Sequence, residues 1–198
     1  MCLSGSKLAG NFLPLFVNLK AARFMITLYL ARHGQTVENL SHIFQGHLPG
    51  TLTEEGKQQA VELGQALHEI PLDAVVSSDL QRVVDTVRLA VGDRHLPWQQ
   101  TALLREIDWG PWTGLTVGSV DLSHPPAGVE TPQMLYDRAG VFLEYLWQHY
   151  DGLRVLVVAH GQINRCLEAR MKGVALDDLR TIPLMKNAEF HRYELAGE

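Results

Sequence analysis

The chain has 198 residues, of which 46% are hydrophobic and 20% are charged, and its formal net charge is −5. This length and balance predict one globular domain with a sizeable core. The negative charge argues against a nucleic-acid-binding protein with a broad basic face, and no apolar run reaches the about 20 residues that a membrane-spanning helix needs.

The first 24 residues differ from the rest of the chain. They contain no Asp or Glu, and Pro14 interrupts their apolar patch. A secretory signal would need an unbroken apolar run of about 7–15 residues. We therefore expect residues 1–24 to be an extension outside the fold, with a targeting peptide as the alternative, and residues 25–198 to form a single domain. The two cysteines, Cys2 and Cys166, cannot form a disulfide framework, which favours a reducing, cytoplasmic location.

The first predicted strand ends in a distinctive trio. Residues 26–31 are apolar or β-branched, a pattern typical of a buried strand, and Arg32, His33 and Gly34 follow directly. Ligands bind at the C-terminal ends of strands in open α/β sheets. We interpret His33 as a phosphate-accepting nucleophile, and we expect other parts of the chain to supply phosphate-binding cations and a proton donor.

Strand and helix patterns alternate along the rest of the chain. A polar loop over 37–52 precedes a helix that Thr53 caps and Pro71 ends. Further strands are expected at 73–78, 98–104 and 153–159, with a weakly alternating edge strand at 188–195. Further helices are expected at 80–90, from Thr131-Pro132 through the apolar stripe ending at Leu146, and after His160. The alternation predicts an α/β fold, a three-layer α/β/α sandwich with a mainly parallel sheet.

Five residues share a position at a strand end or in the helical turn after it: Arg32, His33, Arg82, Glu106 and His160. Such ends converge at one edge of a doubly wound sheet. Arginine matches phosphate geometry with a planar fork of donors. Two arginines and a protonated His160 would hold the phosphoryl oxygens, and His33 would attack phosphorus while a backbone carbonyl fixes its other nitrogen. Glu106 would protonate the departing alkoxide and later deprotonate water.

The motifs around these residues resemble those of the histidine phosphatase superfamily, also called the phosphoglycerate mutase-like family. The matching stretches are Arg32-His33-Gly34, residues 77–82, residues 104–114 and Ala159-His160-Gly161, and they occur in family order. The resemblance implies a phosphoglycerate mutase-like fold, a phosphohistidine intermediate and no metal or cofactor. It also implies substrate or phosphate contacts at Thr36, Asn39, Gln45, Gly46 and Gly161.

Simpler interpretations stand beside these roles. Thr36 and Asn39 could serve only to cap or turn the chain. His42 and His47 could join His33 in a metal site, but their spacing matches no usual ligand motif, so we expect solvated loop histidines.

The family contains both hydrolases and mutases. Mutases typically insert a long segment with basic residues between the acid and the second histidine. Here the corresponding segment, residues 107–159, is short, and its only Lys or Arg residues are Arg138 and Arg154. We therefore favour a phosphomonoester hydrolase acting on a small phosphorylated metabolite, resembling the α-ribazole phosphatase or broad-specificity branch. The alternatives are a phosphoglycerate mutase, a phosphohistidine protein phosphatase and a catalytically silent phosphate-binding regulatory module of the same fold.

Overall fold

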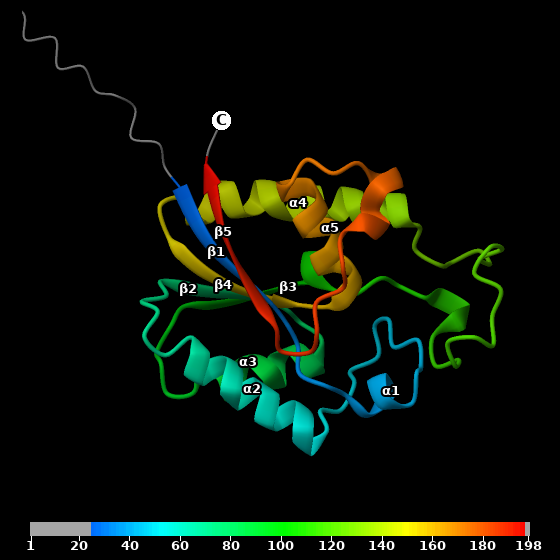
Figure 1. The fold of residues 1–198 in the computed structure, drawn as a ribbon, viewed down its shortest axis with the longest axis horizontal. Coiled ribbons are helices and arrows are strands. Elements are labelled where there is room, and N and C mark those ends of the chain that lie inside the picture. The colour runs from blue at the N-terminus through cyan, green and yellow to red at the C-terminus, as the bar shows by residue number, and fades with distance from the viewer. Residues whose placement is uncertain (1–24, 197–198) are drawn as a thin grey trace, which may run out of the picture.

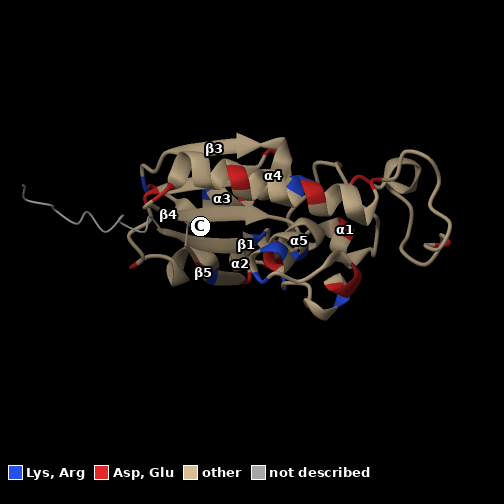
Figure 2. Ribbon diagram, turned by 90° about the horizontal axis from the view of Figure 1, so that it is seen from above, with Lys and Arg blue, Asp and Glu red and all other residues tan. Residues whose placement is uncertain are grey.

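The computed structural model describes residues 25–196, so the predicted N-terminal extension lies outside the described residues. Its middle layer is a five-stranded sheet in the order β3-β2-β4-β1-β5. The strands are β1 (Met25–Arg32), β2 (Ala74–Ser78), β3 (Trp98–Thr101), β4 (Arg154–Ala159) and β5 (Phe190–Ala196). The first four are mutually parallel, and β5 runs antiparallel to β1. Strand β5 lies at the edge of the sheet, as its weak alternation predicted. Figure 2 shows the strands side by side, with β3 and β5 outermost.

Helices cover both faces of this sheet (Figure 1). The helices α2 (Glu54–Ala66) and α3 (Gln81–Val91) lie on one face, and α4 (Pro132–Tyr150) and α5 (Gly161–Met171) lie on the other. The predicted three-layer sandwich with a mainly parallel sheet is confirmed. None of the helices in the described part of the chain is long and apolar enough to cross a membrane.

Strand β1 contributes to a core on each face because successive side chains of a strand point in opposite directions. Leu28 and Leu30 are fully buried in the core that includes Phe142 of α4. Tyr29 and Ala31 belong to the opposite core, with Val83 of α3. A strand buried on both faces must be apolar throughout, which explains why residues 26–31 show no polar alternation.

Two helix starts follow directly from the sequence. The Thr53 hydroxyl accepts the backbone N–H of Gly56 at 2.9 Å and caps α2. Thr131 caps α4 in the same way, with Pro132 in the first turn. Helix α2 ends at Ala66 with Leu67 as its C-cap, before the predicted end at Pro71, and hydrogen-bonded turns follow it through Ile70.

Two segments differ from the prediction. The strand expected over 98–104 ends at Thr101, because the Thr101 hydroxyl accepts the Leu103 N–H and starts the 3₁₀ helix η1 (Ala102–Leu104). The loop expected over 37–52 contains the one-turn helix α1 (Val37–Leu40). Further 3₁₀ helices are η2 (Gly110–Trp112) and η3 (Leu176–Thr181).

Candidate active site

Two histidines meet at the C-terminal ends of the central strands. The β1–β4 register pairs Arg32 with Ala159, so His33 and His160 follow neighbouring positions. Their ring centroids lie 5.1 Å apart, and both side chains are buried. A cleft of about 340 Å³ opens beside them, and its lining includes Arg32, His33, Arg82 and Glu106. The structure therefore brings together all five residues that the sequence singled out.

His33 is held in one tautomer. Its Nδ1 lies 2.7 Å from the carbonyl oxygen of Gly34, so Nδ1 carries the proton and donates it to that carbonyl. Nε2 then presents its lone pair, toward which Arg82 Nε donates at 3.4 Å. Burial and the charges of Arg82 and Arg32 hold the pKa of His33 well below its ordinary value. The imidazole is therefore neutral, which is the nucleophilic form.

His160 has a similar environment. Burial, reinforced by Arg82, holds its pKa well below the ordinary value. Its Nε2 lies 2.9 Å from the Ser78 hydroxyl, whereas Nδ1 is buried without a hydrogen-bond partner in residues 25–196. The structure thus favours a neutral imidazole, where the sequence suggested an imidazolium, because desolvation and adjacent guanidinium groups disfavour a further positive charge.

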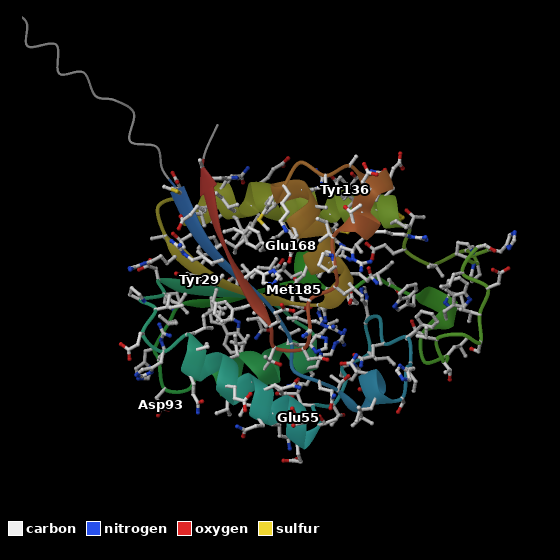
Figure 3. The ribbon with its side chains drawn as sticks, viewed as in Figure 1. Tyr29, Glu55, Asp93, Tyr136, Glu168 and Met185 are labelled. Atoms are coloured by element: carbon white, nitrogen blue, oxygen red, sulfur yellow. The ribbon has the colours of Figure 1, made fainter. Side chains whose placement is uncertain are left out.

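The two arginines are anchored by backbone carbonyls. Arg82 is 1% exposed, and it donates to the Gly46 carbonyl at 3.0 Å and to the Leu48 carbonyl. Burial lowers the pKa of Arg82 to about 10, so it remains charged at neutral pH. Arg32 donates to the carbonyl of Met185 at 2.7 Å, near the centre of Figure 3. Its Nε is buried and has no partner among the residues that the structure describes. Two guanidinium groups therefore face the cleft with donor capacity to spare.

The Glu106 carboxylate lies at the N-terminal end of α5. It accepts the backbone N–H groups of Ile107 at 3.0 Å, Gln162 at 3.1 Å and Ile163 at 3.3 Å. The free N–H groups of a helix N-terminus interact favourably with carboxylates. Its backbone carbonyl accepts from His47 Nε2 at 3.0 Å. The acid is thus fixed from both sides at the mouth of the cleft.

The remaining predicted contact residues separate into two groups. Asn39, Gln45 and Gly46 line the cleft. Thr36 is fully buried behind it, where it forms a capping box with Asn39 and accepts a hydrogen bond from the Gln45 amide. Gly161 begins α5, and a Cβ atom there would lie 3.6 Å from the Arg32 guanidinium carbon. Thr36 supports the cleft wall, and contacts with phosphate by it and by the other four residues stay predictions.

Several residues of the site were not singled out from the sequence. Gln162 and Phe44 line the cleft, and Asn187 donates to the His33 carbonyl at 3.2 Å. Gln162 could have been found, since it lies in the first helical turn after His160. Asn187 lies in an irregular segment before β5, and only the folded chain places it there. Within residues 25–196, no three His, Cys, Asp or Glu side chains are grouped as metal ligands would be.

Comparisons with known proteins show which sequences and folds this chain is similar to. The sequence model of the family described as "Histidine phosphatase superfamily (branch 1)" matches residues 28–198. The adenosylcobalamin/alpha-ribazole phosphatase of Escherichia coli is 33% identical over 163 residues, covering 74% of this chain and 79% of that protein. The glucosyl-3-phosphoglycerate phosphatase of Mycolicibacterium vanbaalenii is 32% identical, covering 86% and 84%. The structure of Bacillus stearothermophilus YhfR matches with a TM-score of 0.79 at 31% identity, covering 84% of this chain and 90% of that one.

Proposed function

Since this chain belongs to the histidine phosphatase superfamily, branch 1, we propose that it is a cytoplasmic, metal-independent hydrolase of small phosphomonoesters. The observation that carries the proposal is the state of His33. Its Nδ1 proton is fixed by the Gly34 carbonyl, and its neutral Nε2 faces two guanidinium groups in the cleft. Those groups match the charge and the planar donor geometry that a phosphate dianion requires.

In the first step, Arg32 and Arg82 hold the phosphoryl oxygens and align phosphorus with His33. The Nε2 lone pair forms the N–P bond while the ester P–O bond breaks. Glu106, entering as the carboxylic acid, donates its proton to the departing alkoxide. The positive charge that develops on the imidazole is stabilised by its Nδ1–H bond to the Gly34 carbonyl.

In the second step, water attacks the phosphohistidine. The Glu106 carboxylate takes a proton from the water as the O–P bond forms and the N–P bond breaks. The electron pair of the N–P bond returns to Nε2, which restores the neutral imidazole and releases inorganic phosphate. Glu106 is again the carboxylic acid, so the cycle balances without a metal or cofactor.

A phosphatase is favoured over a mutase by the short segment between Glu106 and His160. Its two basic residues are already engaged, because Arg138 pairs with Glu130 at 2.8 Å and Arg154 pairs with Asp73 at 2.9 Å. Neither is free to keep a phosphorylated product in place for return transfer. Interconversion of 3-phosphoglycerate in the presence of 2,3-bisphosphoglycerate that outpaces hydrolysis would overturn this preference.

The first test is hydrolysis of p-nitrophenyl phosphate by the purified full chain in EDTA. We expect turnover that EDTA does not reduce, and we expect His33→Ala to lower kcat by about 10³-fold or more, as loss of a covalent nucleophile does. His68→Ala, a change to an exposed histidine at the end of α2, is the matched control. No turnover by the wild type, or equal turnover by His33→Ala, contradicts the proposal, and loss of activity in EDTA contradicts metal independence.

A further inference from the structure

A second cavity adjoins the phosphate cleft and is larger than it. Its volume is about 660 Å³, against about 340 Å³ for the cleft. The two share three lining residues, Trp109, Leu122 and Gln162. A group bonded to a phosphate in the cleft can therefore extend directly into this cavity. The mechanism above uses the cleft alone and assigns nothing to the larger space.

The walls of the second cavity are mainly apolar. They come from the loop after Glu106, the first turns of α4 and α5, and η3, which is drawn in orange above α5 in Figure 1. The apolar lining residues include Ile107, Trp109, Trp112, Val129, Leu176 and Leu179. Such walls favour an apolar or ring-shaped body in the group that they enclose.

Two cations stand in this apolar wall without partners. Arg165 and Arg180 line the cavity, and neither side chain donates a hydrogen bond or joins an ion pair among residues 25–196. Every other arginine that the structure describes does at least one of these. The Nε of Arg165 is also buried. Arg180 is exposed, whereas Arg165 is partly buried. Buried donors in native proteins are normally satisfied, so the unpartnered Nε of Arg165 points to a ligand, and Arg180 adds a second positive charge at the same cavity.

No carboxylate among the described residues forms an ion pair with either arginine. Burial, and to a smaller extent the charge of Arg180, lower the pKa of Arg165, while the charge of Glu106 raises it. Asp177 also lines the cavity but forms no ion pair with either arginine. Glu130, the other acid in the lining, is paired with Arg138. An anion between the two arginines would relieve their repulsion and satisfy both.

Resting on the phosphatase function, we propose that this cavity binds the leaving group of the substrate and that Arg165 and Arg180 hold a second anionic group on it. Arg165 follows Gln162 by three residues on α5, so it lies on the same helix face as the residue that joins the two cavities. The preferred substrate is then a phosphomonoester whose alcohol carries an apolar body and a second acidic group, either a carboxylate or another phosphate.

The test compares matched esters. Phenyl phosphates bearing a carboxylate at the meta or para position are paired with the same esters bearing a neutral carboxamide, and phenylene bisphosphates form a third arm. We expect the wild type to favour at least one anionic ester in kcat/KM by about ten-fold or more, the factor that one charge-assisted hydrogen bond provides. The arm with the larger preference identifies carboxylate or phosphate as the second group.

Two variants test whether Arg165 and Arg180 cause the preference for anionic esters. Arg165→Gln and Arg180→Gln should each lower the anionic-to-neutral ratio several-fold, and the intrinsic reactivity of the esters cancels in that ratio. Arg88→Gln, an exposed arginine on α3, should leave the ratio unchanged. Equal kcat/KM for the anionic and neutral ester of every pair would overturn the inference. So would an anionic-to-neutral ratio that stays at the wild-type value in both cavity variants. Neither result would contradict the proposed phosphatase function. Failure of the wild type to hydrolyse any ester would instead overturn the proposed function.

Discussion

At the scale of single residues, the site is defined by four basic groups whose pKa values are all lowered, of which three are fully buried and Arg32 is partly buried. Burial is the largest cause for His33, His160, Arg32 and Arg82. The two arginines remain positively charged at neutral pH, whereas the two imidazoles are neutral. The free site therefore combines a neutral nucleophile with fixed positive charge, which suits attack on a dianion. A bound phosphate would reverse the Coulomb effect and raise the pKa of His160.

This arrangement predicts the titration of the two histidines. In ¹⁵N-edited NMR spectra of the phosphate-free protein, neither His33 nor His160 should protonate between pH 8 and 5.5, because each pKa lies well below 6.5. The nitrogen shifts of His33 should report the Nδ1–H tautomer. Spectra of His33→Asn and His160→Asn assign the signals. Protonation of either ring near pH 6.5, or an Nε2–H tautomer of His33, would contradict the structure.

At the scale of elements, helix α4 holds the backbone around the proposed acid. Arg138 donates to the carbonyl of Leu103 at 2.9 Å, of Arg105 at 2.7 Å and of Glu106 at 3.3 Å. It also pairs with Glu130, whose carboxylate accepts the Asp108 N–H at 2.9 Å. The chain on both sides of Glu106 is thus tied to α4. Arg138 is a positioning residue that acts through Glu106.

We therefore expect Arg138→Gln to lower kcat/KM most for esters whose leaving group needs a proton from Glu106. Hydrolysis of an alkyl phosphate, whose leaving group needs a proton, should fall about ten-fold or more further than hydrolysis of p-nitrophenyl phosphate. Arg138→Lys should recover part of the loss, since it keeps the charge. The readout is kcat/KM for both esters. An equal loss for the two would show a structural role only.

The secondary-structure elements also explain which parts of the fold and of the site could be predicted from the sequence. His33, Arg82 and His160 were located because each follows a buried strand or begins the next helix, and strand ends converge in a parallel sheet. The shortening of β3 was missed because the Thr101 cap competes locally with an apolar pattern that continues to Leu104. Asn187 and the second cavity were missed because contacts across the fold create them, and no short-range pattern carries that information.

At the scale of the whole molecule, positive and negative residues are interspersed over the elements in Figure 2, so the cleft's positive charge is a local property. That local property affects global stability. The unfolded chain protonates His33 and His160 below about pH 6.5, whereas the folded protein keeps them neutral. The unfolded state then binds more protons, and the free energy of unfolding falls as the pH falls.

The resulting pH dependence can be measured. Each histidine should contribute a slope of up to about 1.4 kcal/mol per pH unit below pH 6.5. Urea unfolding at pH 7.5 and 5.5, in buffers without phosphate, should show lower stability at pH 5.5. The difference should shrink in His160→Asn. The pKa of Asp73 is lowered by its pairing with Arg154, so that group acts only below about pH 4 and does not affect this window. Equal stability at the two pH values would refute the prediction.

The position of β1 between β4 and β5 also affects folding during synthesis on the ribosome. A ribosome releases β1 first among the described strands, but both of its neighbours are encoded near the end of the chain. Until β4 and β5 emerge, both edges of this apolar strand lack hydrogen-bonding partners. Unpaired apolar strands promote aggregation, so we expect the nascent chain to bind chaperones. His33 likewise meets His160 only when synthesis is nearly complete. Products truncated before residue 160 would therefore lack the paired histidines and, on the proposed mechanism, phosphatase activity.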